Sequence, residues 1–190
     1  WKTLYSRISH ANNIIDIIDE MPHATKEDEA LYHRVKGEAH FARAQFYLAL
    51  ANLYGKAYRP DSAATDLCVP LKLTPHVEHD KDKPTQFERA TTGQVYAQIV
   101  ADLNLAVEQL TLSPQPDRYR LHRASAEAAG VLLSRTLLYM QRWTEAEQAA
   151  RRVVESPRVK LAALTDFQMG KPFLTRNNPE VLFSQGANYV

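Results

Sequence analysis

The chain has 190 residues, which is long enough for one hydrophobic core or for an elongated array of repeats. Lys and Arg number 23 and Asp and Glu 22, so the net charge of +1 gives no electrostatic reason to expect nucleic acid or an anionic membrane as a partner. The longest apolar runs fall far short of the roughly 20 residues of a membrane-spanning helix. Cys68 is the only cysteine, which excludes an internal disulfide.

Helical patterns fill the first part of the chain. A first apolar stripe predicts a helix that ends near Met21 and Pro22, and a second, long helix is predicted from about Lys26 to Tyr54 with Thr25 as N-cap. The first stripe consists of Leu4, Ile8, Ala11, Ile15 and Ile18, and the long helix is expected to bury Ala39, Ala42, Phe46, Leu50 and Leu53.

Two glycines lie in and after the long helix. Gly37 costs an exposed helix about 1 kcal/mol relative to alanine, so we expect a neighbouring helix to approach too closely for a Cβ. Gly55 is expected to take the left-handed conformation just past the helix C-terminus.

Residues 55–90 contain four prolines and no helical period, which predicts a long loop, and loops of that length are usually functional or packed over the surface. Three further helices follow. The first opens at Thr91 with a Thr91–Gln94 capping box and is stopped by Pro114 and Pro116. The second spans about Ser125 to Met140, and the third runs from Thr144 to Glu155 with a Thr144–Glu147 capping box.

The last two helices have tetratricopeptide character. In a 34-residue frame starting at Glu127, Leu133 and Leu137 fill the groove between the helices, Trp143 plugs the turn and Ala146 stands where the helices cross. One such pair cannot bury its own apolar face, so the others must stack on it. We therefore predict an all-α, tetratricopeptide-like superhelix over 1–157.

The remainder, 158–190, is expected to be the truncated start of a C-terminal region. Val181-Leu182-Phe183 predicts a short strand near 181–184, and we expect the chain to be an excised segment of a longer protein.

The residues from Gly37 to Gly55 read Gly-Glu-Ala-x-Phe-x-Arg-Ala-x-x-Tyr-x-x-Leu-x-x-x-Tyr-Gly and resemble the signature helix of the SusD/RagB family. The resemblance extends over most of the chain, through Trp1-x-x-Leu4-Tyr5-x-x-Ile8-x-x-x-Asn12, Pro70-Leu71, the segments opening at Thr91 and Arg123, and Asn178-x-Glu180-Val181-Leu182-Phe183. The positions taken as its structural signature are Asn12, Gly37, Glu38, Arg43, Gly55, Asp102, Arg123, Trp143 and Ala146.

The resemblance implies a non-catalytic, surface-exposed nutrient-binding lipoprotein of the Bacteroidetes outer membrane. It would bind an oligosaccharide and deliver it to a TonB-dependent transporter, with a lipid anchor outside this segment and no cofactor. In this family the ligand-binding residues come mainly from segments before the first repeat helix and from the C-terminal half. Two alternatives stay open, a peptide-binding member of the same family and a cytosolic tetratricopeptide adaptor that grips a partner peptide.

A few residues are candidates for ligand or metal sites. Tyr58 and Phe87 could stack on a sugar ring, although aromatics in such a loop more often pin it to the helices. His76 and His79 lie in a loop without a clear third ligand, so no metal site is predicted.

Polar residues on the helices are interpreted as structural. Asn12 should tie the first helix to a neighbour, Glu38 and Arg43 should form an ionic link between stacked helices, and the basic cluster of Arg118, Arg120, His122 and Arg123 should be a solvated helix entry. Because no nucleophile–base grouping or phosphate loop stands out, enzyme activity is not expected.

Overall fold

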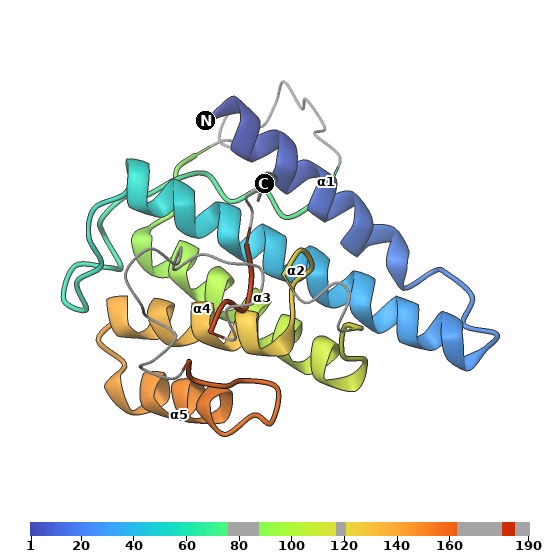
Figure 1. Ribbon diagram of the computed structural model, residues 1–190. Coiled ribbons are helices and arrows are strands. Elements are labelled where there is room, and N and C mark those ends of the chain that lie inside the picture. Colours follow the sequence, from blue (N-terminus) through green and yellow to red (C-terminus); the bar gives the residue numbers. More distant parts are fainter. Residues whose placement is uncertain (76–87, 117–120, 163–179, 185–190) are drawn as a thin grey trace, which may run out of the picture.

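The computed structural model describes residues 1–75, 88–116, 121–162 and 180–184. Five helices in this part of the chain stack in sequence order, each against the next (Figure 1). They are α1 Lys2–Ile18, α2 Lys26–Tyr54, α3 Thr92–Leu112, α4 Ala126–Tyr139 and α5 Trp143–Val154. The predicted all-α architecture is confirmed, and no helix in the described ranges is long and apolar enough to cross a membrane.

Side-chain caps define where most of the helices begin. Thr25 accepts a hydrogen bond from the Asp28 amide and Thr91 accepts one from the Gln94 amide, each as half of a complete capping box. The Thr144–Glu147 box is wrong, because α5 begins one residue earlier, with Arg142 as an N-cap that makes no side-chain hydrogen bond.

The core lies around α2, which packs against α1, α3 and α4. The predicted stripe of α1 faces this core, and so does a stripe of α3 made of Val95, Ile99, Leu103, Ala106 and Leu110. On α2 the prediction was only partly right, because Leu53 is 68% exposed and Ala42 and Phe46 are half-buried. A helix enclosed by neighbours buries more than one face, and the buried positions of α2 accordingly include His40, Phe41, Arg43, Ala44, Tyr47, Leu48 and Ala51 as well as Ala39 and Leu50.

Both glycines of α2 mark close approaches. A Cβ on Gly37 would lie 2.6 Å from Leu110 Cγ of α3, which confirms the expected tight helix contact. Gly55 is not left-handed, since its φ is −92°. Glycine is required there for a different reason, because a Cβ would lie 2.7 Å from both the Ala51 carbonyl oxygen and Cys68 Sγ.

The α4–α5 pair packs through Leu133, Leu137 and Ala146, which are all buried, and Ser134 Oγ donates to the Ala146 carbonyl at 2.9 Å. Trp143 does not plug the turn, because it is 61% exposed. The backbone closes the turn instead.

This turn is a Schellman motif. Gln141 is left-handed, with a φ of 61°, the Arg142 amide donates to the Leu137 carbonyl at 2.9 Å, and the Gln141 amide donates to the Leu138 carbonyl at 3.0 Å. The expected aromatic plug is therefore unnecessary.

The predicted strand at 181–184 is wrong. Residues 181–184 form no strand ladder, and no strand occurs in the described ranges. A strand needs a partner strand, whereas this segment is held by a backbone bond from the Ser184 amide to the Leu121 carbonyl at 2.8 Å and by the edge-on contact of Phe183 with Phe41, whose ring centroids are 5.2 Å apart. Most of the predicted 158–190 region lies outside the described residues.

Candidate functional site

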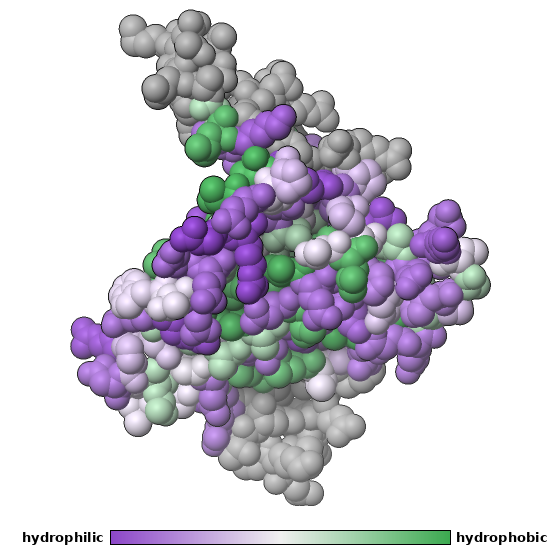
Figure 2. All heavy atoms as spheres, turned by 90° about the horizontal axis from the view of Figure 1, so that it is seen from below, coloured by the Kyte–Doolittle hydropathy of each residue, from purple (hydrophilic) through white to green (hydrophobic). Residues whose placement is uncertain are grey.

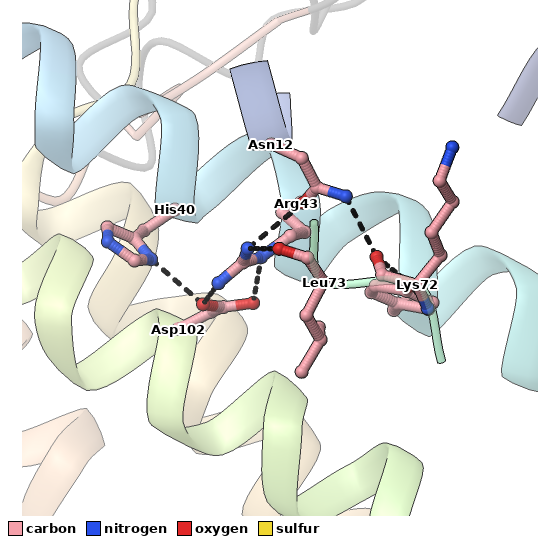
Figure 3. Close-up of polar contacts among 7 residues, drawn as sticks. Asn12, His40, Arg43, Lys72, Leu73 and Asp102 are labelled. Carbon is pink, nitrogen blue, oxygen red and sulfur yellow. Dashed lines mark hydrogen bonds and ion pairs between the residues drawn. The ribbon is translucent and has the colours of Figure 1, made fainter. Parts of the chain in front are cut away.

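A buried cluster of polar residues joins the first three helices (Figure 3). Arg43 of α2 makes a two-pronged ion pair with Asp102 of α3, with Nε donating to Oδ2 at 2.9 Å and Nη2 donating to Oδ1 at 2.7 Å. The Arg43 and Asp102 side chains are 7% and 0% exposed. Paired donors of this kind fix the relative orientation of the two helices as well as their charge balance.

His40, one turn before Arg43 on α2, also contacts the Asp102 carboxylate. Its Nδ1 lies 2.8 Å from Asp102 Oδ1. Burial alone would raise the pKa of Asp102, but the hydrogen bonds from His40 and Arg43 outweigh it and hold that pKa below its usual value. Asp102 is therefore ionised, and because an ionised carboxylate only accepts hydrogen bonds, His40 Nδ1 carries a proton.

Asn12 connects α1 to the same cluster. Its Oδ1 accepts from Arg43 Nη1 at 3.0 Å, while its Nδ2 donates to the carbonyls of Lys72 at 2.9 Å and Thr74 at 3.3 Å. Arg43 Nη1 also donates to the Leu73 carbonyl at 3.5 Å. The four side chains Asn12, His40, Arg43 and Asp102, here called the Arg43 network, thus bind the backbone of the loop as well as one another.

Two tyrosines secure the same loop segment. Tyr47 Oη donates to the Lys72 carbonyl and accepts from the Lys72 amide, both at 2.7 Å, and Tyr5 Oη donates to the Pro70 carbonyl at 2.7 Å. Burial raises the pKa of Tyr47 to about 12, so its hydroxyl keeps the proton that it donates. Residues 70–74 are consequently held by side chains from α1 and α2 without any strand pairing.

The Arg43 network is arranged for structure. Both oxygens of Asp102 are engaged, His40 is 4% exposed, and no buried side-chain polar atom in the described residues lacks a partner. A general base must reach a substrate proton, and the burial of His40 and Asp102 keeps a substrate away from this cluster. The predicted tying role of Asn12 is thus what the geometry shows.

Glu38 and Arg43 do form ionic links between elements, but each has its own partner. Glu38 pairs with Arg123, which lies two residues before the α4 N-cap Ser125. Arg123 Nη2 is 2.7 Å from Oε2 and Arg123 Nε is 2.8 Å from Oε1, and Gln115 also donates to Glu38. Burial raises the pKa of Glu38, against the opposing effect of Arg123. Arg123 is therefore a pairing residue at the helix entry.

Of the two aromatic candidates for a sugar contact, Tyr58 is half-buried and its ring lies 5.1 Å from that of Tyr96 on α3. This contact pins the loop to the helices, as the structural interpretation predicted. Phe87 lies outside the described residues, as do His76, His79, Arg118, Tyr119 and Arg120. Within the described ranges no three His, Cys, Asp or Glu residues are grouped as metal ligands.

Sequence reasoning missed the loop-holding hydroxyls of Tyr5 and Tyr47 and the role of His40. All three stand inside the quoted motifs, and their spacing of three or four residues from Ile8 and Arg43 on the same helices was a usable signal. Their partners could not be read from the chain, because the bonds span between 25 and 65 residues.

The fold and this network define a tetratricopeptide-like helical repeat protein whose polar centre fixes a long loop. Residues 1–138 match the sequence profile of a SusD-like family described as "starch-binding associating with outer membrane". The chain belongs to this SusD-like family.

Solved structures agree with the assignment. A SusD superfamily protein of Bacteroides thetaiotaomicron VPI-5482 is 28% identical with a TM-score of 0.72, covering 88% of this chain and 34% of its own. A putative sugar-binding protein of Bacteroides vulgatus ATCC 8482 is 25% identical with a TM-score of 0.69 and coverages of 82% and 32%. A laminarin-binding SusD-like protein is 26% identical with a TM-score of 0.62 and coverages of 83% and 30%.

The chain therefore spans about a third of the length of these structures. No curated protein matches it.

Proposed function

We propose that this protein is a non-catalytic glycan-binding component of a bacterial outer membrane that delivers an oligosaccharide to a TonB-dependent transporter. The observation that carries the proposal is the match over residues 1–138 to a family described as starch-binding and associated with the outer membrane. Relatives described as sugar-binding and laminarin-binding support the same ligand class.

The described helices fit the role of a rigid scaffold. Their buried polar groups bind one another and the loop backbone, and Tyr58, the aromatic residue considered for sugar stacking, packs on Tyr96. The glycan contacts are accordingly proposed to come mainly from parts of the protein beyond these helices. Attachment to the membrane would be through a lipid anchor elsewhere in the protein.

Binding to soluble starch and laminarin, measured by calorimetry beside a mixed-peptide sample, tests the ligand class. Saturable binding to a glycan is expected, and it is the glycan titration that decides the ligand class. Peptide binding without glycan binding would instead favour the peptide-binding alternative.

Tyr58→Ala separates scaffold from ligand contact. Because the ring packs on Tyr96, the substitution should lower stability by about 1–3 kcal/mol and leave glycan affinity unchanged. A lost affinity with unchanged stability would place Tyr58 in the ligand site and contradict the scaffold role.

Location and partner need separate measurements. The protein should fractionate with the outer membrane and copurify with a TonB-dependent transporter from the native cell. Recovery in the cytosol would overturn this part of the proposal and favour the adaptor alternative.

A further inference from the structure

A groove runs between α3 and α5, with α4 as its floor. Each helix contributes one face at a spacing of three or four residues, and α3 and α5 are not in direct contact with each other. The floor from Ala126 to Leu137 is roughly 16 Å long at 1.5 Å per residue. The lining residues are Val100, Asn104, Val107 and Thr111 of α3, Ala126, Glu127, Gly130, Leu133 and Leu137 of α4, and Arg142, Glu145, Gln148, Ala149, Arg152, Val153 and Ser156 in and around α5.

The two ends of the groove differ in chemistry. One end is a hollow of about 250 Å³ that is mainly apolar and includes Val107, Leu133 and Val153. Its floor contains Gly130, where a Cβ would lie 2.6 Å from Val153 Cγ2, so α5 lies against a floor without a side chain. The other end is a more polar hollow of about 150 Å³.

Charges along the rim are balanced except at one residue. Arg142 Nε pairs with Glu145 Oε1 at 2.6 Å, and Glu127 accepts from Ser156 Oγ at 2.9 Å and lies 3.9 Å from Arg158 Nε. Arg152 lines both hollows and, within the described ranges, makes no hydrogen bond or ion pair. The rim therefore has one unpaired positive charge, at the junction of its apolar and polar ends.

Unpaired amides accompany this charge at the polar end. Asn104 and Gln148 are exposed and, like Arg152, have no partner in the described part of the chain. α5 lies at the lower edge of Figure 1, and the view from below in Figure 2 shows apolar residues gathered centrally between hydrophilic ones. An occupant needs apolar groups for one end, a negative charge for the middle and hydrogen-bonding groups for the other end.

We propose that this groove binds a peptide segment of a partner protein in which a carboxylate lies between apolar side chains. The carboxylate pairs with Arg152, an apolar side chain enters the hollow beside Val107 and Leu133, and backbone amides bond to Asn104 and Gln148. A peptide meets these demands together, because it alternates apolar side chains, charged side chains and backbone hydrogen-bonding groups. The site is separate from the proposed glycan site and does not depend on it.

The test uses three labelled synthetic peptides of equal length, built from alternating leucine with glutamate, glutamine or lysine. Fluorescence anisotropy with residues 1–190 should show the glutamate peptide binding about fivefold more tightly than the glutamine peptide, which is the upper range for an ion pair at an interface rim. The lysine peptide should bind more weakly than both.

Two neighbouring arginines provide a matched pair of variants. Arg152→Gln should abolish the preference for glutamate, so that the glutamate and glutamine peptides bind equally. Arg151→Gln should keep the preference, because Arg151 is outside the groove and pairs with Glu147 at 2.6 Å. Both side chains are exposed, so circular dichroism should confirm an unchanged fold.

Equal binding of the three peptides, or an equal loss of preference in both variants, would overturn the proposal. Two further outcomes would also overturn it in favour of another occupant. Self-association that Arg152→Gln abolishes, without peptide binding, would indicate a second copy of the chain. Binding of polygalacturonate that the same variant abolishes, without peptide binding, would indicate an anionic glycan.

Discussion

Replacement of Asp102 by asparagine removes the negative charge at the centre of the Arg43 network while keeping the shape of the side chain. Asp102 is fully buried and accepts three hydrogen bonds, from His40 Nδ1 and from Arg43 Nε and Nη2, at 2.7–2.9 Å. An asparagine offers one acceptor oxygen, and its NH₂ group would face donors. The variant leaves the Arg43 guanidinium buried and without its counter-charge.

Breaking a buried ion pair from one side costs about 3–5 kcal/mol. For a domain of this size each kcal/mol lowers Tm by about 2–4 °C, so Asp102→Asn should melt roughly 6–20 °C below the parent chain. Urea unfolding followed by circular dichroism at 222 nm measures the free energy directly.

The matched control is Asp19→Asn. Asp19 is 61% exposed and pairs with Lys36 at 2.5 Å, so the same chemical change there should cost at most about 1 kcal/mol. If Asp102→Asn unfolds no more easily than Asp19→Asn, the Arg43 network does not stabilise the fold and the reasoning is refuted.

Three further predictions concern pH and packing. Because the pKa of Asp102 is lowered in the folded state, its contribution is present above the unfolded pKa of about 4 and is lost as pH falls through the folded value, so acid unfolding should be less steep in Asp102→Asn than in the parent. Gly37→Ala gains about 1 kcal/mol of helix propensity, but its Cβ would lie 2.6 Å from Leu110 Cγ and would push that side chain away. We therefore expect the free energy of unfolding to fall by about 1–2 kcal/mol, and a raised Tm would contradict this. Ala146→Leu should cost about 1–3 kcal/mol by overpacking, whereas Ala101→Leu on the exposed face of α3 should cost less than about 0.5 kcal/mol; equal melting temperatures would disprove the crossing contact.

The elements that sequence predicted well depend on local physics. The start of α2 at Lys26 and of α3 at Thr92 follow from capping residues that bond within their own first turn, so no distant information was needed. Gly37 was also interpretable, since a mid-helix glycine implies a close neighbour. What the sequence could not supply was the neighbour's identity, Leu110.

The sequence predictions were wrong where tertiary packing, or a competing local backbone arrangement, determines the structure. Trp143 fits a turn aromatic by position, but a left-handed Gln141 closes that turn through the backbone. Gly55 is the residue type expected at a left-handed helix C-terminus, yet glycine is needed there because a Cβ would collide with Cys68 Sγ. The run at 181–184 has β-propensity, which has little meaning without a pairing strand.

The polar character of the Arg43 network has a physical reason in the loop that it holds. A buried ion pair can often be replaced by apolar residues at little cost, since desolvation offsets its attraction. Here that exchange would also remove Asn12 and Arg43 as donors to three consecutive loop carbonyls, those of Lys72, Leu73 and Thr74, although the Lys72 carbonyl would keep its bond from Tyr47 Oη. Each such hydrogen bond contributes about 0.5–1.5 kcal/mol, so an apolar core could hold the helices together but would fix this loop less firmly. Asn12, Arg43 and Asp102, three positions of the family resemblance, therefore fix the scaffold of helices and loop.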